Sequence, residues 1–288
     1  MTVLITGANG CFGRALFKWL TDNVSDEIIC SGSFSDLQRE RYVTCDVSDR
    51  GQVQETIDRI RPRLIYHVAG SFSNAYEKDY AVNSLGAKNI FDSLLDACVE
   101  ARVVLFGSAA EYGLVDPEDN PIKESQSLRP VSIYGLTKVI QTQFAYFYAH
   151  THGVDAVVAR VFNLLMPGLS DRLFLGKVEQ MIRKIKAGEA STMELGNLES
   201  HRDYVTGPQA LDQVALITSR GIAGEAYNVG SGEPKKIHDV LEHMLSEAGL
   251  DWFVVKEQSS GLQRSGYDVP VIYADLSKTN ALSGLING

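Results

Sequence analysis

The sequence predicts an α/β fold in which a doubly wound parallel sheet is covered by helices on both faces. Three observations support this class. Strand-like and helix-like segments alternate from residue 3 to residue 160, a glycine-rich turn follows the first apolar run, and the pattern loosens after Phe162. We therefore expect a sheet domain over residues 1–162 and a smaller α/β lobe over residues 163–288, with interleaved chain segments.

The strands expected in the first half cover residues 3–5, 27–30, 41–45, 64–68, 103–106 and 154–160, which are short apolar runs bounded by turn residues. The helices expected between them cover 14–20, 52–60, 83–99 and 132–150, where apolar residues recur at helical spacing. In the second half we expect helices at 173–187, 208–219 and 236–248, and short strands at 193–195, 227–229 and 252–255. The sequence contains no repeat or linker, so the lobe is predicted to pack on the sheet domain.

Composition and charge argue against several classes of partner. The 288 residues carry a net charge of −9 without a basic tract, so we expect neither nucleic acid nor a membrane as a partner. No apolar run reaches the ~20 residues that a membrane-spanning helix needs, and no signal-peptide pattern precedes the first strand. The four cysteines form no C-x-x-C pair, which predicts reduced thiols, a cytoplasmic protein and no metal site.

The turn over residues 6–13, TGANGCFG, is the most informative motif. It follows an apolar strand and opens a helix, with glycines at positions 7, 10 and 13. Such glycines allow a tight turn, a close backbone approach and close helix–strand packing, and the following helix N-terminus can face a pyrophosphate. The motif therefore predicts a Rossmann-type dinucleotide site, and an ordinary glycine turn is the alternative.

Tyr134 and Lys138 form the candidate catalytic pair. They are four residues apart on one predicted helix, so both side chains lie on the same face. An ammonium group beside a phenol favours the phenolate, and we expect it to lower the tyrosine pKa. Ser108 follows the strand at 103–106, at the carboxyl edge where α/β sheets bind ligands, and its hydroxyl can hydrogen-bond the same substrate oxygen.

These motifs resemble those of the extended short-chain dehydrogenase/reductase superfamily, of the NAD-dependent epimerase/dehydratase type. Beyond TGANGCFG, the resemblance includes CDVSD (45–49), HVAG (67–70), NSLGAKNIF (83–91), GSAAEYG (107–113), YGLTK (134–138), RVFN (160–163) and HRDYV (201–205). It implies a Rossmann domain, a C-terminal lobe that binds a nucleotide sugar, and a homodimer formed through the helices at 86–99 and 136–150.

The turn and the resemblance together imply a set of binding residues. The expected cofactor-binding residues are Gly7, Asn9, Gly10, Cys11, Phe12, Gly13, Arg14, Ser31, Asp46, Val47, Ala69, Gly70, Asn83, Tyr134 and Lys138. The expected substrate-binding residues are Ser108, Ala109, Asn163, Arg202 and Arg264. Each of three residues has an alternative role. Asp46 could be an acidic residue in a surface turn, and Asn163 could hydrogen-bond backbone groups of its own loop. Arg264 could be a surface arginine.

Missing groups narrow the reaction that the resemblance implies. In 4,6-dehydratases of this family an acid/base pair occupies the positions of Ala109 and Ala110, which here have no proton to transfer. GDP-fucose synthases carry a cysteine at the position of Ala110 and a histidine near Gly168, and both are missing. The remaining Ser108, Tyr134 and Lys138 suit a ketoreductase or a 4-epimerase.

The cofactor and the substrate branch follow from two further segments. Residues 30–33 carry no acid, and the next one is Asp36, so nothing repels a 2′-phosphate that Arg14, Arg39 or Arg41 could bind. We therefore expect NADPH, with NADH possible. The segment 195–205 is similar to the GNL-x-x-x-RD segment of the GDP-mannose branch. The resemblance thus implies an NADPH-dependent 4-reductase of a GDP-linked 4-keto-6-deoxy sugar. The alternatives are a 4-epimerase with tightly bound NAD and a non-catalytic dinucleotide sensor.

Overall fold

A seven-stranded parallel sheet forms the centre of the computed structural model, which describes residues 1–33, 41–257 and 269–284. Its strand order is β10-β6-β5-β4-β1-β2-β3. The strands are β1 (Thr2–Thr6), β2 (Glu27–Gly32), β3 (Tyr42–Thr44), β4 (Leu64–His67), β5 (Arg102–Ser108), β6 (Ala156–Val161) and β10 (Ala226–Val229). The order reverses between β1 and β4, which makes this the switch point where doubly wound sheets bind ligands. The predicted fold class is confirmed.

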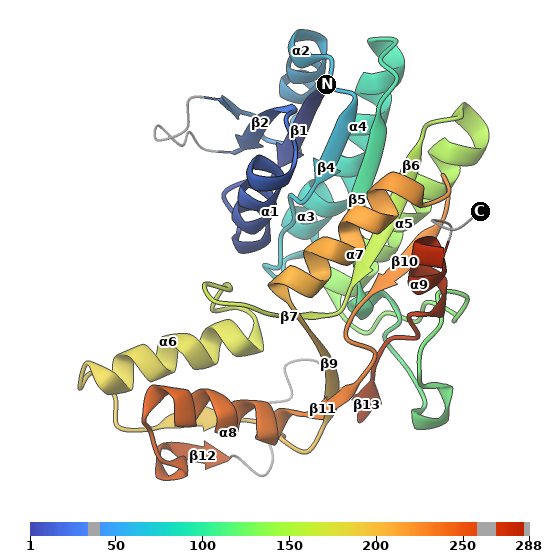
Figure 1. Ribbon diagram of the computed structural model, residues 1–288. Helices are drawn as coiled ribbons and strands as arrows, with labels where there is room; N and C mark the ends of the chain where they lie inside the picture. Colours follow the sequence, from blue (N-terminus) through green and yellow to red (C-terminus); the bar gives the residue numbers. More distant parts are fainter. Residues whose placement is uncertain (34–40, 258–268, 285–288) are drawn as a thin grey trace.

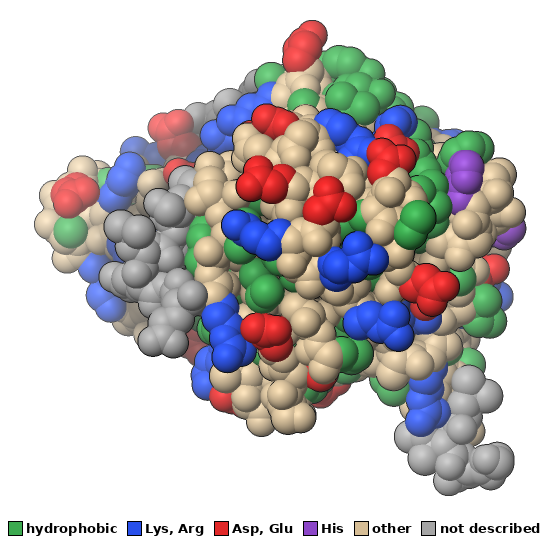
Figure 2. Space-filling view, turned by 90° about the horizontal axis from the view of Figure 1, so that it is seen from above, with side chains coloured by type: hydrophobic (Ala, Val, Ile, Leu, Met, Phe, Trp, Pro, Cys, Tyr) green, Lys and Arg blue, Asp and Glu red, His purple; other side chains and the backbone are tan. Residues whose placement is uncertain are grey.

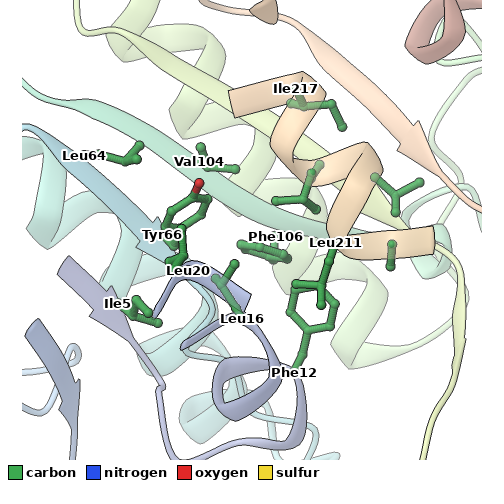
Figure 3. Close-up of a cluster of buried hydrophobic side chains, with 14 of the residues drawn as sticks. Ile5, Phe12, Leu16, Leu20, Leu64, Tyr66, Val104, Phe106, Leu211 and Ile217 are labelled. Carbon is green, nitrogen blue, oxygen red and sulfur yellow. The ribbon is translucent and has the colours of Figure 1, made fainter. Parts of the chain in front are cut away.

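Helices cover both faces of this sheet (Figure 1). On one face lie α1 (Cys11–Asn23) and α7 (Gly207–Arg220), and on the other lie α2 (Arg50–Ile60), α4 (Gly86–Asp96) and α5 (Ile133–His152). Two apolar clusters result, because successive strand residues point to opposite faces. Val104 and Phe106 pack with α1 and α7, whereas Val103 and Leu105 pack with α4 and α5. Figure 3 shows the first cluster, with Phe12, Leu16 and Leu211 between the helices and the sheet.

The smaller lobe lies below the carboxyl ends of the strands in Figure 1. Its helices α6 (Phe174–Lys186) and α8 (Ile237–Ala248) pack over the strand pair β8 (Met193–Leu195) and β12 (Val255–Glu257). A second small sheet joins β7 (Asn163–Leu165), β9 (His201–Thr206), β11 (Pro234–Lys236) and β13 (Val271–Ile272). Part of the chain beyond residue 162 returns to the seven-stranded sheet. β10 is one of its strands, and α7 and α9 (Ser277–Gly284) pack against it.

Two predicted elements differ from the structure. The first residues of the helix expected at 83–99 belong to a π-helical turn, η1 (Tyr80–Leu85). The helix α4 then ends before Cys98, whose positive φ of 49° breaks the helical conformation. The strand expected at 252–255 is mainly a 3₁₀ turn, η4 (Trp252–Val254), because the Asp251 carboxylate accepts a hydrogen bond from the Phe253 N–H and caps the turn. Only Val255 continues as a strand, in β12.

The surface agrees with the charge pattern of the sequence. On the face shown in Figure 2, acidic and basic side chains are interspersed, and neither sign forms a continuous patch. Among the described helices, none combines the length and apolar character that crossing a membrane requires.

Candidate active site

The glycine-rich turn connects β1 to α1 at the switch point. Gly7 has a φ of +69°, and a Cβ there would lie 2.5 Å from the Ala69 backbone at the end of β4. A Cβ on Gly13 would collide with the Gly7 carbonyl. Gly10 caps α1 without a side-chain hydrogen bond, and the first turn of α1 contains no acidic residue. The free N–H groups and the positive end of the helix dipole are therefore suited to a pyrophosphate.

Three buried polar atoms around this turn have no hydrogen-bond partner in the part of the chain that the structure describes. They are Asn9 Oδ1, Ser31 Oγ at the end of β2, and His67 Nε2 at the end of β4. A buried polar atom without a partner is costly, so a ligand with hydroxyl and amide groups fits this edge. The residues present therefore fit a nicotinamide dinucleotide.

His67 is a neutral side chain at this edge. Its side chain is fully buried, and Nδ1 lies 2.8 Å from Thr6 Oγ1. Burial and the nearby Lys138 ammonium lower the pKa of His67 to about 3. The imidazole therefore adds no positive charge at neutral pH.

The other expected residues of the turn make contacts within the protein. Cys11 Sγ donates to the Pro167 carbonyl at 3.1 Å, which connects the turn to the smaller lobe. Phe12 packs against Phe106 with ring centroids 5.2 Å apart. Arg14 is exposed, and its guanidinium donates to the Asn9 carbonyl at 2.5 Å.

Asp46 and Val47 follow β3. The Asp46 carboxylate accepts from the N–H and the hydroxyl of Ser48, at 2.9 and 2.7 Å, so it shapes its own turn. Val47 is buried against Gly86, where a Cβ would lie 2.9 Å from Val47 Cγ2. Arg41 is exposed, whereas Asp36, Arg39 and Arg264 lie outside the described residues.

Tyr134 and Lys138 lie in the first two turns of α5. The helix begins after Ser132, whose hydroxyl accepts from the Gly135 N–H at 3.0 Å. A Cβ on Gly135 would collide with the Ala110 carbonyl, so glycine lets the helix approach the end of β5. The buried Lys138 ammonium donates to the Phe106 carbonyl and to Gln141 Oε1, both at 2.8 Å. It lies 5.9 Å from the centroid of the Tyr134 ring.

The expected fall in the tyrosine pKa is wrong. Burial raises the pKa of Tyr134 to about 12, and a hydrogen bond with Ser108 opposes the rise only in part. Burial also lowers the pKa of Lys138 to about 8, although Glu111 acts in the opposite direction. The lysine ammonium is bonded to Phe106 and Gln141 rather than to the phenol, so desolvation dominates. Tyr134 is therefore a neutral phenol, which is a proton donor.

Ser108 ends β5 and begins the 3₁₀ turn η2 (Ala109–Glu111). Its hydroxyl accepts from the Ala110 N–H at 3.2 Å, and its own N–H donates to Glu111 Oε1 at 2.8 Å. The structure therefore brings Ser108, Ala109, Tyr134 and Lys138 together at one end of β5.

The loop after β4 forms a further wall of the site. Asn83 Oδ1 accepts from the Ser71 N–H at 2.7 Å, and its Nδ2 donates to Thr137 Oγ1 on α5 at 2.9 Å, which fixes the loop beyond Ala69 and Gly70. The Asp79 carboxylate at the end of α3 (Tyr76–Asp79) accepts from both Ser71 and Ser73. Although burial alone raises it, these hydrogen bonds leave the pKa of Asp79 below its ordinary value.

Sequence reasoning missed two features of this region. Phe72, in the same loop, packs edge-on against Tyr134 with ring centroids 4.9 Å apart. Glu111 and Arg160 form a buried ion pair with an Nε–Oε2 distance of 3.0 Å. A signal for the pair was available, because an arginine inside the apolar strand Ala156–Val161 requires a buried acidic partner.

Asn163 and Arg202 lie on the neighbouring strands β7 and β9. Asn163 Nδ2 donates to the Asp203 carbonyl at 3.0 Å, so it satisfies a backbone group. Arg202 Nη1 donates to the carbonyls of His201 and Val269, at 2.9 and 2.6 Å. These hydrogen bonds join both side chains to the backbone of the lobe.

Comparison with known proteins shows the family. The profile of the NAD dependent epimerase/dehydratase family matches residues 3–230, and the chain belongs to this family. It is therefore an NAD(P)-dependent oxidoreductase, as predicted. The GDP-6-deoxy-D-talose 4-dehydrogenase of Aggregatibacter actinomycetemcomitans is 27% identical over 283 residues, which cover 96% of this chain and 90% of that protein.

Two solved structures have the same fold. RMD from Pseudomonas aeruginosa, complexed with NADPH, superposes with a TM-score of 0.83 at 21% identity, over 98% of this chain and 92% of that one. The UDP-glucose 4-epimerase of Thermus thermophilus, complexed with NAD, gives a TM-score of 0.85 at 22% identity, over 98% and 93%. At these identities the likeness concerns the fold.

We predict that His67 makes the fold sensitive to acid. Its folded pKa of about 3 lies below the ordinary 6.5, so the unfolded chain binds the proton first. The contribution of neutral His67 to the free energy of unfolding is complete above pH 6.5. It falls as the pH drops, by up to about 1.4 kcal/mol per pH unit. Urea unfolding at pH 7 and pH 5 measures this fall.

His67→Gln should reduce this fall, whereas His150→Gln, at an exposed position on α5, should leave it unchanged. An equal fall in the wild type and in His67→Gln would contradict the prediction.

Proposed function

We propose that this protein is an NADPH-dependent 4-reductase of a nucleotide-activated, GDP-linked 4-keto-6-deoxy sugar. The observation that carries the proposal is the grouping of Ser108, Tyr134 and Lys138 at one end of β5, beside the apolar Ala109 and Ala110. These three residues suffice for proton exchange at one carbonyl, and the alanines supply no second acid/base pair. The similarity to a GDP-6-deoxy-sugar 4-dehydrogenase and to a fold solved with NADPH supports the choice.

The neutral Tyr134 phenol can supply the proton that reduction of a ketone requires. When bound, the nicotinamide supplies hydride to the keto carbon. The Tyr134 phenol donates its proton to the keto oxygen, and the Ser108 hydroxyl hydrogen-bonds the same oxygen. A phenolate remains, which the Lys138 ammonium stabilises electrostatically until a solvent proton replaces the one transferred. With a pKa of about 8, Lys138 carries this charge at neutral pH.

Substrate and cofactor choice test the proposal directly. We expect NADPH oxidation with a GDP-4-keto-6-deoxy sugar, and slower turnover with the dTDP and CDP analogues. NADPH should exceed NADH in kcat/KM by about tenfold or more, since a charge-assisted hydrogen bond contributes about 1.5–3 kcal/mol. The end of β2 supports this preference, because Ser31, Gly32 and Ser33 carry no acidic side chain that would repel a 2′-phosphate.

Each rival function predicts a different result in this experiment. A preference for NADH would contradict the cofactor assignment. A purified protein that retains NAD and interconverts C4 epimers would be a 4-epimerase. A protein that binds NADPH without turning over any of these sugars would be a dinucleotide sensor.

Tyr134→Phe should remove most turnover and preserve cofactor binding. The ring keeps its packing against Phe72, and only the transferable proton is lost. We expect kcat to fall by about 10²–10⁴-fold, the usual contribution of a general acid. NADPH fluorescence should give a dissociation constant close to that of the wild type. Near-complete activity in the variant would remove Tyr134 from its assigned role.

We also propose a homodimer formed through α4 and α5. Leu95 on α4 and Leu136 and Phe147 on α5 are exposed apolar side chains. Sedimentation should therefore give about twice the chain mass of 31.6 kDa. A monomer at micromolar concentration would contradict this assembly.

A further inference from the structure

The buried carboxylate of Glu111 contacts all the elements that carry the catalytic residues. Its side chain is fully buried. Oε1 accepts from the Ser108 N–H at 2.8 Å, and Oε2 accepts from the Thr142 hydroxyl on α5 at 2.9 Å and from Arg160 Nε on β6 at 3.0 Å. Thr142 lies one helical turn after Lys138. One side chain therefore connects the Ser108 turn, the Tyr134–Lys138 helix and the neighbouring strand.

The space around Glu111 is shaped for this carboxylate. A Cβ on Gly107 would lie 2.5 Å from Oε1, so glycine leaves room for it at this point of β5. Arg160 is also fully buried, and its Nη1 donates to the Tyr112 hydroxyl at 3.0 Å. Tyr112 in turn donates to Asn228 Oδ1 on β10 at 2.6 Å. This hydrogen-bonded chain links the Ser108 turn to the edge strand of the sheet.

Protein stability alone is a weak explanation for the buried Glu111–Arg160 ion pair. Replacing a buried ion pair with apolar side chains of similar volume is often neutral or stabilising, because desolvation offsets the attraction. The ion pair lies instead beside the Ser108 turn and the Tyr134–Lys138 helix. Small displacements of reacting groups there would reduce reaction rates strongly. Both carboxylate oxygens are used in contacts to the elements that hold Ser108, Tyr134 and Lys138.

We propose that Glu111 is a positioning residue, which sets the separation between the Ser108 turn and the Tyr134–Lys138 helix through its bonds to Ser108, Thr142 and Arg160. This proposal rests on the proposed function for its reaction. The negative charge of Glu111 also favours the protonated forms of Tyr134 and Lys138. The proton donor and the ammonium are therefore held in the states that reduction requires.

The charged and titratable groups around this cluster come from several elements. His67 on β4 faces Lys138, and Asp79 of α3 acts on Tyr134. Arg160 on β6 faces Glu111 together with Tyr112 and Tyr146. Of these groups, Glu111 is the acid that acts on Lys138, so removing its charge should make the lysine lose its proton at lower pH.

The test compares Glu111→Gln with a control variant that removes a second arginine-paired carboxylate next to β5 and β6. Asp155 pairs with Arg102 at 2.9 Å, at the amino ends of β5 and β6, so Asp155→Asn removes an arginine-paired but more exposed carboxylate at the opposite edge of the sheet. We expect Glu111→Gln to lower kcat about 10- to 100-fold without changing NADPH affinity. The ¹³C NMR titration of labelled Lys138, assigned with Lys138→Arg, should move to lower pH. Asp155→Asn should change none of these quantities.

The remaining outcomes are decisive. A folded Glu111→Gln with wild-type kcat and an unchanged Lys138 titration would overturn the proposal, as would an equal loss of kcat in Asp155→Asn. If Glu111→Gln does not fold, Thr142→Val, which keeps the ion pair, should still lower kcat, and full activity in that variant would overturn the proposal. If the wild type reduces none of the sugars, the proposed function fails, and the Lys138 titration in Glu111→Gln still decides the role of Glu111.

Discussion

The parallel direction of the seven strands is the constraint on which the site depends. Because all carboxyl ends lie at one edge, Gly7, Ser31, His67 and Ser108 come together from β1, β2, β4 and β5, although more than a hundred residues separate the first from the last. The reversal between β1 and β4 leaves this edge uncovered by a crossover connection. Neither small sheet of the lobe supplies a strand to this edge; their strands lie beyond it (Figure 1).

Buried carboxylates fix the loops at this edge. Asp79 holds the loop that carries Phe72 against Tyr134, and Glu111 holds the Ser108 turn. Asp203 on β9 does the same for the lobe, because it accepts from the N–H groups of Ser231, Gly232 and Ala274 at 2.6–3.1 Å. A carboxylate accepts several donors at once, so it can order irregular backbone that secondary structure leaves unpaired. Hydrogen bonds to these carboxylates therefore hold the loops that carry Phe72 and Ser108.

The sequence was sufficient for features that depend on local pattern. Alternating apolar runs predicted the sheet and its covering helices, and the i, i+4 spacing placed Tyr134 and Lys138 on one helix face. The short strands β7, β9, β11 and β13 were not predicted, since each is stabilised by partners distant in the chain rather than by its own pattern. The Glu111–Arg160 pair likewise depends on the register between β5 and β6. The spacing of residues along the sequence does not reveal this register.

The error over the Tyr134 pKa shows a second limit. Spacing places an ammonium on the same helix face as a phenol, but the sign of the shift depends on burial and on where the ammonium donates its hydrogen bonds. Here Lys138 is bonded to Phe106 and Gln141, and burial raises the pKa of Tyr134. His67 stays neutral and the charge of Arg160 is balanced by Glu111, so Lys138 is the one net cation of this buried group of described residues. A neutral phenol beside a single ammonium can donate a proton to a developing alkoxide and then be stabilised as phenolate.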